Sequence, residues 1–126
     1  MIPNATLMRD VLTEAAKTAQ GTELLLAEDG KRDLFGEALY MIGVPEHNLR
    51  DAISGSYQTI IAIHALTVYI EAGLMWHRGK REDALQWARL WASRRTVGEI
   101  RRQLSDGGIS IEERTETEEK THAISR

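Results

Sequence analysis

The sequence predicts an all-α protein, a compact bundle of five to six helices around a central apolar helix at about residues 56–78. Residues 60–76 are apolar on nearly every side of a helix, and such a helix has to be surrounded by other helices. Elsewhere, apolar residues recur at spacings of three and four, which is the helical period. No strand pattern, phosphate-binding loop or metal-binding motif in the sequence competes with this interpretation.

The length and composition predict one domain followed by a tail. With 126 residues, of which 42% are hydrophobic and 28% charged, the chain resembles an ordinary globular domain. We expect a single helical domain at residues 1–108 and a mobile, frayed or disordered acidic tail at residues 109–126. The tail is rich in Glu and Thr and has few apolar side chains to bury.

Two features of the sequence bear on its compartment. The absence of cysteine excludes disulfides, zinc–thiolate sites and thiol nucleophiles, and it permits a reducing environment. The N-terminus lacks the basic and apolar regions of a secretory signal. His64, Thr67 and Glu71 argue against a membrane span at residues 60–76, because a charge at that depth costs roughly 2.5–3.5 kcal/mol. We therefore expect a cytoplasmic protein that does not bind membranes.

The N-terminal part of the chain is expected to form two helices and a short helical turn. Apolar residues form one stripe over residues 7–19, and Gly21 is expected to end this helix. The stripe consists of Leu7, Met8, Val11, Leu12, Ala15, Ala16 and Ala19. Three leucines within residues 22–29 suggest a short second turn of helix. Another helix is expected at residues 31–42, with Gly43 at its end because glycine adopts positive φ there.

The remaining elements follow from start and stop signals. Pro45 opens a short helix, since proline is favoured at the first helical position. The central helix begins after the Ser-Gly-Ser break at residues 54–56 and ends at Gly79. A further helix is expected at residues 84–92. The Thr-Val-Gly-Glu sequence at residues 96–99 is a capping-box pattern, which predicts a last short helix.

The strongest functional signal is an uneven charge distribution, although the formal net charge is only −3. Residues 77–102 hold eight Lys or Arg against three Asp or Glu, whereas residues 1–76 hold five against ten. The basic segment also carries two tryptophans one turn apart, and tryptophan is enriched at binding hot spots. We therefore predict a partner-binding surface there. Its residues are Trp87, Trp91, Arg81, Arg89, Arg94, Arg95, Arg101 and Arg102.

These observations favour a small non-enzymatic binding or regulatory protein that acts through protein–protein contacts. A bacterial, plasmid or phage accessory factor would suit this profile. A single helix cannot easily bury both Trp87 and Trp91 in so small a domain, so an aromatic surface between two copies is expected. We therefore also predict a homodimer.

A nucleic-acid-associated protein is the alternative hypothesis, with the arginine stripe of residues 78–102 binding phosphates. A helix-turn-helix is not expected. The segment that would form its recognition helix, residues 111–119, is acidic and would be repelled by phosphates. Salt separates the two hypotheses, because phosphate binding weakens steeply as salt rises whereas a tryptophan-centred protein interface changes little.

A helical-bundle enzyme is a third hypothesis, and it depends on His64 and Glu71. These residues are seven apart and so share one face of the central helix. No third ligand lies at helical spacing from either, and no Ser or Cys nucleophile accompanies them. His47, His64 and His77 are too dispersed for a helical metal motif. We therefore predict no catalytic residues, no metal and no cofactor.

Overall fold

The computed structural model describes residues 1–55 and 69–113, and it contains helices and no β-strand within them. The six helices are α1 (Met8–Thr18), α2 (Leu34–Met41), α3 (Glu46–Ser54), α5 (Tyr69–His77), α6 (Arg81–Ala92) and α7 (Val97–Asp106). The predicted all-α class is therefore confirmed. Helix α5 is the last part of the predicted central helix, whose residues 56–68 lie outside the described part.

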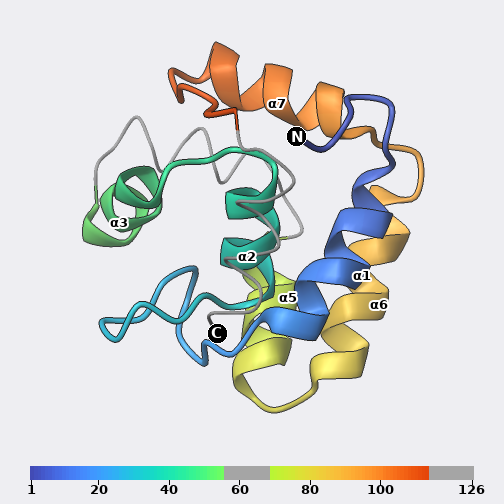
Figure 1. The fold of residues 1–126 in the computed structure, drawn as a ribbon. Coiled ribbons are helices and arrows are strands. Elements are labelled where there is room, and N and C mark those ends of the chain that lie inside the picture. The colour runs from blue at the N-terminus through green and yellow to red at the C-terminus, as the bar shows by residue number, and fades with distance from the viewer. Residues whose placement is uncertain (56–68, 114–126) are drawn as a thin grey trace.

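The helices pack around one apolar core. Helix α1 packs against α2 and α6, and α5 packs against α2 and α6 (Figure 1). Helix α7 crosses one end of this group and lies beside the N-terminal segment (Figure 1). Main-chain bonds join the two, from the Val97 N–H to the Thr6 carbonyl (2.8 Å) and from the Gly98 N–H to the Asn4 carbonyl (3.0 Å). The N-terminal segment is thereby held to the start of α7.

Local sequence signals account for several helix ends. The Asp33 side chain caps α2 by accepting a hydrogen bond from the Gly36 N–H at 2.8 Å. The Thr96 hydroxyl accepts from the Glu99 N–H at 3.2 Å, so the predicted cap at residues 96–99 forms and starts α7. Gly43 has a φ of 109°, which confirms the expected left-handed conformation after α2.

The segment between α1 and α2 differs from the prediction. Helix α1 ends at Thr18, before Gly21, and residues 22–29 form no helix. Instead the segment turns back on itself: the Gly21 N–H donates to the Arg32 carbonyl (2.8 Å), and the Asp33 N–H donates to the Leu25 carbonyl (3.2 Å). These main-chain bonds satisfy the backbone groups that a helix would have paired internally. Leu25 adopts a φ of 60° within this turn.

The segment after α7 packs against the domain rather than leaving it at residue 109. Ile109 is only 3% exposed, and Ile111 contacts the same core. The Glu112 N–H donates to the Gly43 carbonyl at 2.8 Å. Two isoleucines at the start of the predicted tail thus bury apolar surface against the helical domain. The rest of the predicted tail of residues 109–126, from residue 114 onward, lies outside the described part.

Candidate functional site

Helix α6 packs through a narrow inner face made of alanine. Ala84, Ala88 and Ala92 recur every four residues and are 0% exposed, on the side where α6 packs against α1 and α5. Small side chains let helices approach closely, and a close-packed interface leaves no room for large apolar groups. The large side chains of α6 therefore lie on its flanks and on its outer face.

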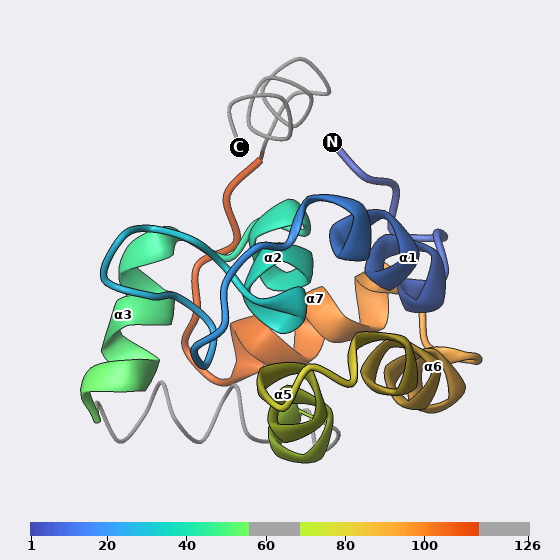
Figure 2. The same ribbon diagram turned by 90° about the horizontal axis from the view of Figure 1, so that it is seen from below.

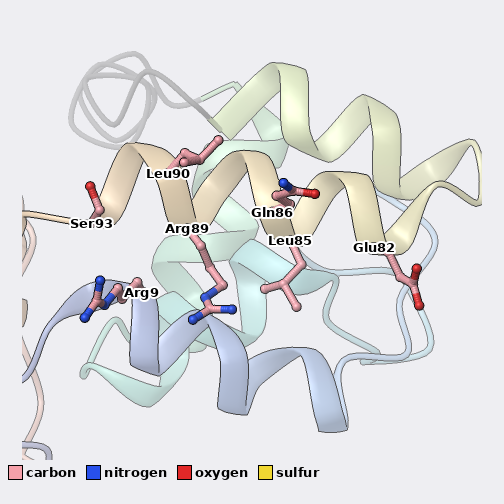
Figure 3. Close-up of a pocket in the computed structure, with 7 residues that line it drawn as sticks. All are labelled: Arg9, Glu82, Leu85, Gln86, Arg89, Leu90 and Ser93. Carbon is pink, nitrogen blue, oxygen red and sulfur yellow. The ribbon is translucent and has the colours of Figure 1, made fainter.

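A groove of about 450 Å³ lies between α6 and the start of α1. Its lining residues are Arg9, Glu82, Leu85, Gln86, Arg89, Leu90 and Ser93, which define the α6 groove (Figure 3). Leu85 and Arg89 point from α6 toward α1, and Arg9 stands at the start of α1 (Figure 3). Neither Arg89 nor Glu82 forms an ion pair with any other described residue. The groove thus offers two guanidinium groups beside an apolar floor.

The two tryptophans of α6 have different environments. Trp87 is 42% exposed, whereas Trp91 is half-buried against the core. The Trp91 indole N–H is buried and has no acceptor among the described residues. The Arg95 guanidinium lies 4.5 Å from the centre of the Trp91 ring. The expected aromatic surface therefore contains one exposed tryptophan, with Trp91 partly covered beside it.

Trp76 belongs to the core. It is 3% exposed, and its indole N–H donates to the Gly21 carbonyl at 2.7 Å. This bond ties α5 to the loop after α1 and explains why Gly21 is buried. The Arg81 guanidinium covers the Trp76 ring at 4.6 Å from its centre, a distance that permits a cation–π contact.

The predicted arginines do not form one continuous stripe. Arg81 and Arg95 each lie over a tryptophan ring, whereas Arg89 lines the α6 groove. Arg94 and Arg102 are exposed on α6's end and on α7. Arg81 and Arg95 thus contact aromatic rings on different elements, Trp76 on α5 and Trp91 on α6.

Arg101 lies inside the protein and is removed from the partner-binding set. It is 7% exposed, and its guanidinium donates to the carbonyls of Ile42 (2.9 Å) and Ile2 (2.6 Å). It also donates to the Asn4 side-chain oxygen at 2.9 Å. Its positive charge is thus used to join α7, the end of α2 and the N-terminal segment.

A buried charged cluster at the start of α2 is absent from the sequence prediction. Arg32 and Glu37 are 0% and 1% exposed, and their charged groups approach to 3.6 Å. Arg32 also donates to the Glu46 carboxylate at 2.9 Å, and its guanidinium lies 3.7 Å from the centre of the Tyr40 ring. In the sequence, the one feature that indicated this cluster was Glu37, a charged residue within the otherwise apolar helix α2. Because desolvation offsets much of the attraction in such a pair, its main effect is to fix how α2 and α3 meet.

His77 connects the end of α5 to this region. Its Nε2 lies 3.4 Å from an oxygen of the buried Asp33 carboxylate. The hydrogen bond to Asp33 raises the pKa of His77 above its usual 6.5, burial opposes this, and the nearby Glu23 adds to the rise. Asp33 therefore both caps α2 and contacts His77.

The enzyme hypothesis concerns residues that the structure does not describe. His64 lies outside the described residues, as does the side chain of Glu71. In the described part of the chain, no three His, Asp or Glu side chains are grouped so as to hold a metal ion. None of the described helices combines the length and the apolar character that crossing a membrane requires.

The surface of α6 is thus the leading candidate site, and its function has to be inferred from its own residues. Comparisons with protein-family models, with curated proteins and with solved structures find no match for this chain.

Proposed function

We propose that this protein is a non-enzymatic binding protein that recognises another protein through the α6 groove. The observation that carries the proposal is the exposure of large apolar side chains on α6 beside that groove. Leu90 is 66% exposed and Trp87 is 42% exposed. Such groups on one helix, next to a groove in which Arg89 and Glu82 form no ion pair with any described residue, are typical of interaction surfaces.

The groove residues define the chemistry of the partner. Leu85 supplies an apolar floor, while Arg9 and Arg89 supply guanidinium groups that bind carboxylates bidentately. The partner that fits is a protein segment with an apolar side chain flanked by Asp or Glu. Because the chain contains no cysteine, we place this interaction in the reducing environment of the cytoplasm.

Phosphate binding by residues 78–102 receives less support. Arg101 is buried and hydrogen-bonded, and Arg81 and Arg95 lie on indole rings. These three arginines are therefore already engaged within the protein, which leaves fewer free cations for phosphates.

Site-specific crosslinking tests the proposal. A photoreactive amino acid is placed at Arg9, on the α1 side of the groove, and the protein is irradiated in native cell extract. We expect a distinct protein adduct, which is identified by mass spectrometry and is lost when Arg89→Glu is added. Arg102→Glu is the matched control, because Arg102 is exposed on α7 outside the groove, and it should leave the adduct unchanged.

Three results would contradict the proposal. A nuclease-sensitive adduct would favour the nucleic-acid alternative. An adduct that also forms from a photoreactive group at Arg102 would show non-specific capture. An adduct that survives Arg89→Glu would place the partner elsewhere on the surface.

A further inference from the structure

Four exposed residues at spacings of four, three and four run along the outer face of α6 and into the turn that follows it. They are Asp83, Trp87, Leu90 and Arg94, which we call the outer ridge. This spacing places Asp83, Trp87 and Leu90 in one line along α6, as in the seam of a coiled coil, and Arg94 lies in the turn directly after the helix. Among the described residues, neither Asp83 nor Arg94 forms an ion pair. The ridge is therefore apolar in the middle, acidic at its start and basic at its end.

We propose that the outer ridge binds a second copy of this chain, with the two α6 helices antiparallel about a two-fold axis. The axis passes midway between residues 88 and 89, so residues equally distant from that point meet across the interface. Trp87 then lies opposite Leu90 of the second copy, and Asp83 lies opposite its Arg94. Each contact occurs twice, as a two-fold axis requires.

Charge selects the antiparallel arrangement. A parallel pair would bring Asp83 against Asp83 and Arg94 against Arg94, and like charges at such positions destabilise a helix pair. The antiparallel pair instead matches every ridge charge with an opposite one. It also places the N-terminal end of each helix beside the C-terminal end of the other, which is the favourable arrangement of helix dipoles.

The position of α6 leaves the ridge accessible. Helix α6 lies at the periphery of the molecule in both ribbon views (Figure 1 and Figure 2). The inner groove residues Leu85 and Arg89 point toward α1, and Leu90 points away from it (Figure 3). Only Leu90 belongs to both the ridge and the groove. The self-pairing thus shares Trp87 and Leu90 with the surface proposed above, whereas the charged groove residues Arg9, Glu82 and Arg89 take no part in it.

The small size of the ridge predicts a reversible dimer. Helix α6 has 12 residues, which at 1.5 Å each span about 18 Å. One helix pair of this length buries less than the roughly 800 Å² per partner that stable complexes need. We therefore expect a monomer–dimer equilibrium that shifts with protein concentration.

Sedimentation velocity on the purified full chain over a concentration series tests the pairing. We expect the wild type to dimerise, and Asp83→Arg and Arg94→Asp each to raise the dissociation constant about tenfold or more, because two attractions become repulsions. An equimolar mixture of the two variants should associate as well as the wild type. In the mixed dimer, every charged ridge position again faces its opposite, so recovery also shows that both variants are folded.

Asp106→Arg and Arg102→Asp make the same charge changes at exposed positions of α7 and should leave the dissociation constant unchanged. The proposal is overturned if the wild type remains monomeric up to about 1 mM, well above the dissociation constant of a weak specific complex. It is equally overturned if the mixed variants fail to associate, or if the α7 controls weaken the dimer as much as the ridge variants do. None of these outcomes decides the crosslinking test from Arg9, because that test detects an adduct with another protein rather than self-association.

Discussion

Replacing Arg101 by methionine should destabilise the protein substantially, because this arginine joins three separate segments. Its guanidinium donates to the Ile42 carbonyl (2.9 Å), the Ile2 carbonyl (2.6 Å) and the Asn4 side chain (2.9 Å). Methionine keeps the apolar stem and removes every donor. A hydrogen bond from a charged donor contributes about 1.5–3 kcal/mol, and a buried acceptor left without a donor costs about 1–3 kcal/mol.

The three acceptors differ in the free-energy cost of losing their donor. Ile42 is 0% exposed, so its carbonyl at the end of α2 gains no water when the donor is lost. Asn4 is exposed, and its oxygen can be hydrated. We therefore expect Arg101→Met to lower the free energy of unfolding by about 2–4 kcal/mol, which includes the full cost at Ile42 and a reduced cost at the other two. For a chain of this size, the change corresponds to a fall of roughly 8–16 °C in Tm.

Urea denaturation followed by circular dichroism measures the effect. The matched control is Arg102→Met, which makes the same substitution at the exposed neighbouring position and should stay within about 0.5 kcal/mol of the wild type. Hydrogen exchange adds a local readout, since residues 2–6 should lose protection in the Arg101 variant. Equal stability of the two variants would refute the reasoning, because it would show that the buried guanidinium contributes nothing beyond its stem.

Two further predictions concern α2 and its neighbours. Gly36→Ala should unfold the protein or destabilise it by more than about 3 kcal/mol, because the added Cβ overlaps the Leu25 carbonyl oxygen and neither backbone can move aside; thermal melts measure this. His77→Asn should lower stability at low pH only. Since the pKa of His77 is raised when folded, its contribution is complete below about pH 6.5 and disappears as the pH rises through the folded value.

Each of these predictions has a matched control in the same chain. Gly73→Ala also adds a methyl group within a helix, but its nearest neighbour is a side-chain carbon of Leu24 at 3.3 Å, which can shift. It should be neutral or stabilising, by up to about 1 kcal/mol, through helix propensity. For His77, the control His47→Asn at an exposed position should show no loss of stability that depends on pH in the same way. If the stability lost in His77→Asn instead grew as the pH rose, the inferred direction of the His77 pKa shift would be wrong.

The helices could be predicted from the sequence because their signals are local. The apolar stripe of α1 and the threonine cap of α7 each involve residues within a turn or two of one another. The loop at residues 22–29 could not be predicted in the same way. Three consecutive leucines are compatible with a helix, and what prevents one is main-chain pairing with Arg32 and Asp33 across the turn. Such pairing depends on tertiary contacts that a single stretch of sequence does not display.

The same distinction explains what the sequence could reveal of the candidate site. Counting charges correctly identified residues 77–102 as basic, but it gave all the arginines equal weight. The structure separates them by partner: Arg101 contacts segments nearly sixty and a hundred positions away, Arg81 lies on Trp76, and Arg89 lines the groove with no ion pair to any described residue. The partners of Arg101 are too distant in sequence for any helical spacing rule to find them.

The inner face of α6 gives the physical reason why its outer face is available for binding. Ala84, Ala88 and Ala92 bury so little side-chain area that the helix must lie very close to its neighbours to contribute to the core. Leu90 is 66% exposed and therefore adds little to folding, although a polar residue there would be hydrated better. Two of the large apolar groups of α6, Trp87 and Leu90, thus lie where they add little to the stability of the monomer. Trp87 and Leu90 can contribute free energy only when another surface covers them. Both proposals, a protein partner at the groove and a second copy at the outer ridge, supply such a surface.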